Sequence, residues 1–218
     1  MKTSTAPVHT PRDLDHALEL RAAHPEAMPL AGCTDVMVFI EAGAIDPPAF
    51  LDLWGLGALR GVHAEEDTLW IGALTTYTEM IESDLIEVWA PALVEAARTC
   101  GAKQIQNRGT IGGSIANGSP AGDSLPVLLV IDAEVELASA ARGRRRVPMS
   151  SLYTGYRTLA MKPDELITRV AIPRPHDHDV THYRKVGTRL AQAISKVVLG
   201  GRLRIENGVV TEIGRAHV

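Results

Sequence analysis

The chain has 218 residues, a formal net charge of −4 and 45% hydrophobic residues, a composition typical of a globular protein with a real core. The mild acidity argues against a nucleic-acid-binding surface, which needs a basic face. No apolar run approaches the ~18 residues of a membrane span, and the first residues lack the apolar centre of a signal peptide. We therefore predict a cytoplasmic protein, with one large domain or two small ones.

The first quarter of the sequence predicts a small parallel α/β unit. Thr10 and Pro11 are typical of a helix start, since a hydroxyl cap is followed by proline at the first helical position, and helical spacing continues to Arg21. The next predicted elements are a strand, a turn, a helix that ends at a glycine, and a second strand, at residues 28–31, 32–35, 36–43 and 50–53.

The middle of the sequence predicts an antiparallel sheet with helices on one face, starting near residue 57. Residues 59–73 read as two strands joined at Glu65–Asp67. Further strands follow from alternation and β-branched content, and they lie at 134–139, 145–149 and 166–173. The predicted helices lie at 75–83, 91–100 and 124–133. The basic run at 142–146 lies between two of the strands, and we interpret it as a solvated hairpin tip.

The last segment predicts two strands and a hairpin. The strands lie at 180–187 and 195–213, and Asn207-Gly208 is a strong hairpin signal. Because a two-stranded unit cannot bury a core alone, we expect the chain to be incomplete at this end. The last residues, "EIGRAHV", can be back-translated into the start of a widely used sequencing adapter. We hypothesise that Gly214–Val218, or all of 212–218, is adapter read-through, which the coding DNA would test.

The cysteines and histidines argue against a metal centre. Cys33 and Cys100 fit a reducing compartment, and two cysteines are too few for an iron–sulfur cluster. The "HDH" run at 176–178 follows a Pro-x-Pro segment, so we interpret it as a polar loop. No nucleophile–base pair stands out, and we therefore predict no catalytic residue.

Two glycine-containing segments are the main functional signal: "LAGCTD" at 30–35 and "RGTIGGSIANGSPAGD" at 108–123. Glycine lets backbone approach a ligand closely, and successive N–H groups of such turns form a concave anion site. Thr34, Thr110 and Ser114 add neutral donors. Neither common nucleotide fingerprint is present. The residues favour either a dinucleotide such as FAD, with its diphosphate between the segments, or ordinary glycine-rich structural loops.

Asp123 follows the second glycine segment and has two interpretations. A carboxylate beside a diphosphate would be repelled, so Asp123 should face a sugar or ribityl hydroxyl group. Alternatively, it caps the helix that follows. The residues alone leave both open.

Five motifs together resemble the FAD-binding (medium) subunits of the molybdenum hydroxylases, the family of xanthine dehydrogenase and aerobic carbon monoxide dehydrogenase. They are "PLAGCTD", "IGALTTYTEM", the segment from "GAKQIQNRGTIGGS" to "IDAEVEL", "DELITRVAIP" and "HYRKVGTRLAQAISKV". The resemblance covers residues 8–211, and its last segment is most similar to xanthine dehydrogenase-like members.

The resemblance implies an α+β, two-lobed FAD-binding fold of the PCMH/vanillyl-alcohol-oxidase type. Residues 1–57 would form an α/β lobe and residues 58–176 an α+β lobe, with FAD in the cleft between them. Residues 177–218 would then be the start of a truncated C-terminal α/β domain.

The resemblance also implies which residues hold FAD. The first segment would wrap the pyrophosphate, the second would form another phosphate loop, and Asp123 would bond the ribose or ribityl side. Ile167 or Leu166 would contact the flavin through the backbone, and Lys185 would reach the isoalloxazine ring. Without the resemblance, Tyr183 and Lys185 would be read as lying on opposite faces of an exposed strand. The implied set is Pro29, Leu30, Ala31, Gly32, Cys33, Thr34, Asp35, Val36, Gly72, Thr75, Thr110, Gly112, Gly113, Ser114, Asp123, Ile167 and Lys185.

Two residues depart from the family pattern. Cys33 replaces the second glycine of the usual A-G-G-T, which is costly if that position needs a positive φ. Ser114 replaces the asparagine of G-G-N and has a shorter reach. We expect both changes to weaken FAD binding without abolishing it.

The resemblance implies a function that depends on partners. The substrate would be hydroxylated at a molybdenum cofactor on another subunit, and electrons would pass through [2Fe–2S] clusters on a third subunit to FAD and then to NAD⁺ or another acceptor. The protein would position and tune the flavin. We therefore predict an FAD-dependent oxidoreductase subunit that is inactive alone. The alternatives are a self-contained FAD oxidase of the same fold and a non-enzymatic flavin-binding assembly module.

Overall fold

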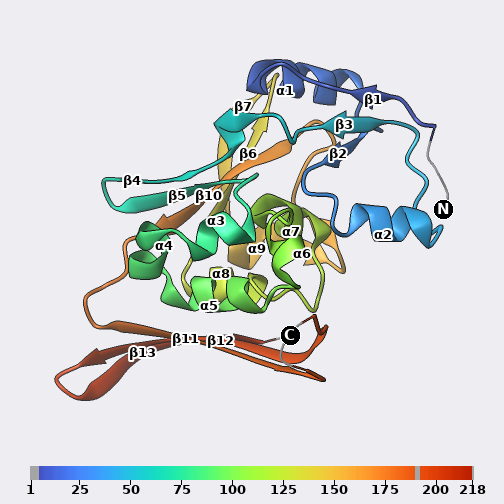
Figure 1. Ribbon diagram of the computed structural model, residues 1–218. Coiled ribbons are helices and arrows are strands. Elements are labelled where there is room, and N and C mark those ends of the chain that lie inside the picture. The colour runs from blue at the N-terminus through green and yellow to red at the C-terminus, as the bar shows by residue number, and fades with distance from the viewer. Residues whose placement is uncertain (1–4, 190–191, 218) are drawn as a thin grey trace.

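The N-terminal group of elements is a parallel sheet with two helices. The computed structural model describes residues 5–189 and 192–217. Three parallel strands lie in the order β1-β3-β2, as Figure 1 shows in blue. The group consists of β1 (Val8–His9), α1 (Leu14–Ala23), β2 (Met28–Leu30), α2 (Val36–Glu41) and β3 (Phe50–Asp52). The predicted parallel α/β unit is confirmed, although β1 was missed.

Helix α1 starts later than the sequence predicts. It begins at Leu14, and the carboxylate of Asp13 accepts a hydrogen bond of 2.8 Å from the backbone N–H of His16. The predicted start at Thr10 and Pro11 is therefore wrong. Aspartate caps helices at least as well as threonine, and Asp13, which lies closer to the apolar residues of the helix, is the N-cap.

A five-stranded antiparallel sheet forms the middle of the molecule, in the order β4-β5-β10-β6-β7. Its strands are β4 (Val62–Glu65), β5 (Thr68–Gly72), β6 (Glu134–Ser139), β7 (Gly143–Pro148) and β10 (Leu166–Pro173). The last of these lies in the centre, where Val170 pairs with Ile71 on one side and Val135 on the other. The predicted antiparallel sheet is confirmed.

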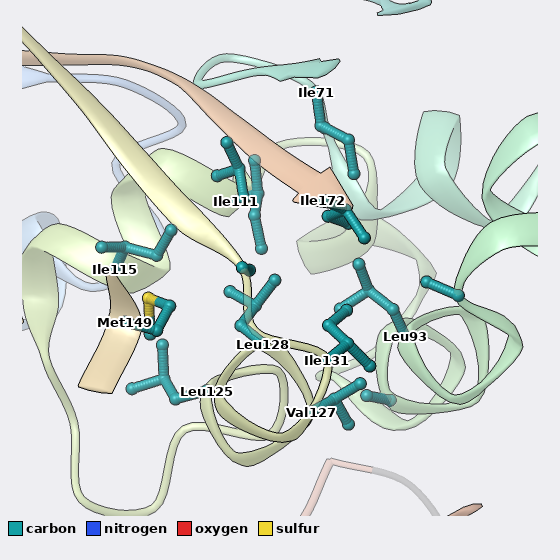
Figure 2. Close-up of a cluster of buried hydrophobic side chains, with 14 of the residues drawn as sticks. Ile71, Leu93, Ile111, Ile115, Leu125, Val127, Leu128, Ile131, Met149 and Ile172 are labelled. Carbon is teal, nitrogen blue, oxygen red and sulfur yellow. The ribbon is translucent and has the colours of Figure 1, made fainter. Parts of the chain in front are cut away.

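Short helices cover one face of this sheet (Figure 1). They are the α-helices α3 (Tyr77–Ile81), α4 (Asp84–Trp89), α5 (Pro91–Thr99), α6 (Lys103–Gln106), α7 (Ile111–Asn117), α8 (Leu125–Val130) and α9 (Met149–Leu152), followed by the hairpin β8 (Tyr153–Gly155) and β9 (Thr158–Leu159). A 3₁₀ turn, η1 (Gly57–Leu59), precedes β4 and packs through Leu59 in the second core. The main core lies between helices and sheet, where Figure 2 shows Leu93 and Leu128 together with Ile71 and Ile172.

A second core joins the N-terminal group to the rest of the molecule. Ala17 and Leu51 pack in one buried cluster with Leu59, Leu74 and Leu166. The N-terminal unit therefore shares its apolar interior with the five-stranded sheet.

The C-terminal strands form a third layer beneath the helices (Figure 1). The antiparallel sheet has the order β11-β12-β13, with β11 (Asp179–Gly187), β12 (Ser195–Glu206) and β13 (Val209–His217). The hairpin predicted at Asn207-Gly208 is confirmed, with φ values of 51° and 76°. Tyr183, Val198 and Ala216 of this sheet belong to the main core. Val218, part of the suspected adapter segment, lies outside the described residues.

The basic run at 142–146 is more than a solvated tip. Most of it lies in β7, paired with β6, where Arg144 Nη1 is 2.9 Å from Glu136 Oε1 and Arg145 Nε is 2.7 Å from Glu165 Oε1. Both carboxylates are buried, and the hydrogen bond from Arg145 is the main cause of the lowered pKa of Glu165. The arginines therefore neutralise buried carboxylates of the sheet.

Within the described residues, no helix is long and apolar enough to cross a bilayer. The cytoplasmic location stays a prediction.

Candidate functional site

The two glycine-containing segments lie against each other at backbone distance. A Cβ atom at Gly32 would overlap the carbonyl group of Arg108, and one at Gly113 would lie 3.9 Å from the Cβ of Ala31. Only glycine fits at position 32, since a larger residue would push the segments apart. The structure thus joins segments that are far apart in the sequence into one site.

The first segment presents a row of free backbone donors. Pro29 and Leu30 end β2, and the turn leads to α2, which begins at Val36. In the described part of the chain, the N–H groups of residues 32–36 donate to no protein acceptor. This turn is partly accessible, as is the side chain of Thr34. Successive free N–H groups in a turn suit an anion.

Cys33 lies in the left-handed region of backbone space, with a φ of 62°. Its thiol donates a weak hydrogen bond of 3.4 Å to the carbonyl oxygen of Ala31, and burial raises its pKa. A left-handed conformation costs a non-glycine residue about 1–2 kcal/mol. The turn therefore carries strain that the usual glycine would avoid.

The second segment begins a helix rather than forming an open loop. Helix α7 begins at Ile111, so Gly112, Gly113 and Ser114 lie in its first turn. The hydroxyl of Thr110 caps the helix by accepting from the N–H of Gly113 at 3.1 Å. The N–H of Ser114 donates to the carbonyl of Thr110 at 3.0 Å. These two N–H groups are therefore already used within the protein, and phosphate binding by this segment stays a prediction.

The motif at 72–75 holds the start of α7 in place. The carbonyl of Thr75 accepts from the N–H of Ile111 at 3.1 Å, and that of Ala73 accepts from Gly112 at 2.9 Å. A Cβ at Gly112 would lie 2.7 Å from the Cβ of Ala73. Close packing thus accounts for Gly112 without a ligand.

Asp123 is bonded to the C-terminal sheet. Its carboxylate accepts from Lys185 Nζ at 2.7 Å and from the hydroxyl of Tyr183 at 3.2 Å. Lys185 Nζ also donates to the carbonyl of Thr99 at 3.1 Å. The side chains of Asp123 and Lys185 are only 9% and 10% exposed. The pair therefore links the start of α8 to β11 through a nearly dry contact.

Two interpretations from the sequence are corrected here. The N-cap of α8 is Ser124, and no side chain caps it, so the helix-cap role of Asp123 is wrong. Tyr183 and Lys185 both point inward to Asp123, because residues two apart in a strand share a face. Reading them on opposite faces of an exposed strand was also wrong.

Burial controls the titration of this buried cluster. It raises the pKa of Asp123 above the ordinary value of 3.8, although hydrogen bonds from Lys185 and Tyr183 oppose the shift. Burial also raises the pKa of Tyr183, and it raises that of the nearby Cys100 thiol to about 11. Such shifts indicate a low local dielectric.

The strand residues expected at the flavin lie at an irregular point of β10. The side chains of Leu166 and Ile167 are buried, and the pairing with β6 shifts register between Ile167 and Arg169. The carbonyl of Thr168 accepts from the N–H of Ala73 at 2.9 Å. The irregularity thus brings the 72–75 motif onto the central strand.

An aromatic–cation stack beside the first turn was missed in the sequence. The guanidinium carbon of Arg108 lies 3.7 Å from the ring centroid of Trp54, and that of Arg60 lies 4.6 Å from it. The available signal was the arginine directly before the glycine and threonine at 109–110, combined with a tryptophan just after the strand at 50–53.

The sequence matches a known family over most of its length. Residues 2–175 match the family described as "FAD binding domain in molybdopterin dehydrogenase". The chain belongs to this family, and FAD is its cofactor.

Individual relatives agree with this assignment. The chain is 34% identical over 210 residues to a xanthine dehydrogenase FAD-binding subunit of Escherichia coli O157:H7, covering 95% of this chain and 72% of that protein. It is 34% identical over 201 residues to a nicotinate dehydrogenase FAD-subunit of Eubacterium barkeri, covering 90% of this chain and 67% of the relative. A carbon monoxide dehydrogenase structure from Hydrogenophaga pseudoflava matches with a TM-score of 0.95 and 26% identity, covering 100% of this chain and 76% of that one.

The residues present fit the diphosphate of FAD at the first turn. That turn offers free N–H groups in a cradle that a Cβ at Gly32 would fill. The second segment fits less directly, because the N–H groups at the start of α7 are paired within the protein. The hydroxyl groups of Thr110 and Ser114 also take part in hydrogen bonds, with the Gly113 N–H and the Ser124 hydroxyl.

Proposed function

We propose that this chain is the electron-transfer subunit of a molybdenum hydroxylase. It would receive electrons from [2Fe–2S] clusters of a small partner subunit, which is itself supplied by a large molybdenum-cofactor subunit. NAD⁺ or another acceptor would take the electrons onward. When bound, FAD supplies the redox chemistry, and the chain's own residues bind and orient it.

The observation that carries the proposal is the first turn. Its N–H groups at 32–36 are free, and Gly32 lets the turn rest directly on the backbone of Arg108. A family that binds FAD, combined with an open row of donors at the predicted pyrophosphate position, supports binding there.

The remaining predicted contacts are proposals of the same kind. We place Asp123 and Lys185 on the flavin side of the site and the backbone of Ile167 beside them. For these side chains to reach a flavin, the ion pair between Asp123 and Lys185 would have to open or share its hydrogen bonds.

A xanthine dehydrogenase-like holoenzyme is the first candidate for the whole complex, because the Escherichia coli relative of that name is 34% identical over nearly the whole chain. A carbon monoxide dehydrogenase medium subunit is the second, because the solved structure of that name superposes over the full chain. The partner genes distinguish them.

Absorbance of the purified chain tests the proposal. We expect the visible spectrum of an oxidised flavin, released as FAD on denaturation, and bleaching under anaerobic NADH if NAD⁺ is the acceptor. Co-purification with iron–sulfur and molybdenum subunits would support the complex over a self-contained oxidase. A colourless protein that binds no FAD on titration would refute the function and favour a structural module.

A further inference from the structure

Arg108 carries a cation without a carboxylate partner. None of the ion pairs of the described residues includes it, although Arg60, on the same tryptophan, pairs with Glu79 at 3.2 Å. The stack on Trp54, at 3.7 Å, holds the exposed guanidinium in place. Its backbone is the surface on which Gly32 packs. The free charge is therefore fixed beside the first turn.

The charge of Arg108 acts on that turn. It lowers the pKa of the Cys33 thiol, opposing the effects of burial and of Asp52, which both raise it. Another cation near the turn is Arg157, which donates to the side chain of Asn117 at 2.9 Å. Arg157 also lowers the pKa of Asp35, against the raising effect of burial.

The carboxylates make such a cation necessary for a doubly charged ligand. Asp35 lies in the turn itself, and Asp52 lies close enough to help raise the pKa of Cys33. Neutral N–H groups alone would leave a diphosphate facing these two negative charges. Arg157 offsets Asp35, and Arg108 is the cation placed to offset the rest.

We propose that Arg108 binds the diphosphate of FAD as its charged donor, and that Trp54 is the positioning residue that aims it. The inference rests on the proposed function and extends it, because the sequence predicted only neutral donors there. A guanidinium matches phosphate oxygens in a planar, two-pronged geometry. Its charge also makes binding sensitive to ionic strength.

Flavin titration of the full chain, after removal of bound flavin, tests Arg108 directly. Arg108→Gln should weaken FAD affinity about tenfold to a hundredfold at low salt, measured by quenching of flavin fluorescence. Arg108→Lys keeps the charge, so its FAD affinity should lie between that of the wild type and that of Arg108→Gln. The matched control is Arg12→Gln, which removes the same charge from an exposed residue whose one ion pair among the described residues is with its neighbour Asp13. Thermal unfolding should be unchanged, since the Arg108 side chain is exposed.

The salt dependence of FAD binding and a variant of Trp54 complete the test. The difference between wild type and Arg108→Gln should shrink as salt rises, and Trp54→Leu should weaken binding less than Arg108→Gln. An affinity of Arg108→Gln within about twofold of wild type, or a deficit independent of salt, would overturn the assignment of Arg108. A wild-type chain that binds no FAD would instead refute the proposed function itself.

Discussion

Replacing Lys185 with methionine tests the buried link between the helices and the C-terminal sheet. The change removes the 2.7 Å ion pair with Asp123 and the 3.1 Å bond to the Thr99 carbonyl, leaving the carboxylate only the hydroxyl of Tyr183. Removing one partner of a buried pair costs about 3–5 kcal/mol. We expect the free energy of unfolding to fall by about 3 kcal/mol at neutral pH, or roughly 6–12 °C in melting temperature for a chain of this size.

The stability loss in Lys185→Met should depend on pH in a defined direction. The pKa of Asp123 is raised in the folded chain above the ordinary value of 3.8. The protonated Asp123 therefore stabilises the fold below pH 3.8, and this stabilisation is lost as pH rises through the folded pKa. Without Lys185 that pKa rises further. The stability difference between wild type and variant should therefore be small near about pH 4 and grow toward neutral pH.

Chemical denaturation followed by circular dichroism measures both effects. Lys103→Met is the control, because Lys103 forms an exposed pair with Glu82 at 3.9 Å and should change stability little. The double variant Asp123→Asn/Lys185→Met should recover much of the loss. A deficit below about 1 kcal/mol, or one that is equal at acid and neutral pH, would refute the dry ion pair.

Three further predictions concern the first turn and the sheet. Gly32→Ala should abolish flavin content, because its Cβ would overlap the Arg108 carbonyl, whereas Gly55→Ala, which meets nothing within 4 Å, should leave it intact; equal flavin in both would contradict the packing. Cys33→Gly should raise stability by about 1 kcal/mol in denaturant titration by relieving the left-handed strain, and a clear loss would argue against that strain. Glu165→Gln should cost about 2 kcal/mol at neutral pH. Because the pKa of Glu165 is lowered, this cost should fade as pH drops below 4.5, and a cost that persists in acid would contradict the pairing.

The regular elements were readable from local signals. Alternation marked β6 and β10, and Asn207-Gly208 marked the last hairpin, because these signals depend only on neighbouring residues. Competing caps a few residues apart, such as Thr10 and Asp13, cannot be ranked without the packing of the helix.

Helix α7 was missed because tertiary contacts override its composition. Two glycines in its first turn lower helix propensity, yet the cap of Thr110 and the carbonyls of Ala73 and Thr75 hold the turn in place. Those carbonyls come from a distant segment, so no local pattern reveals them.

The family resemblance predicted the cofactor and the first turn but not the state of each side chain. The positive φ of Cys33 depends on how the turn meets Arg108, and the pairing of Asp123 with Lys185 depends on a sheet far along the chain. Both are properties of long-range packing.

The central position of β10 constrains how the chain acquires its structure during synthesis. The β4–β5 and β6–β7 ribbons are each made early, and each is only marginally stable alone. They can join only after β10 has left the ribosome and Val170 has found Ile71, across a long sequence separation that slows folding. Until then both ribbons present an open edge that can pair with other chains, so soluble yield should depend strongly on expression temperature.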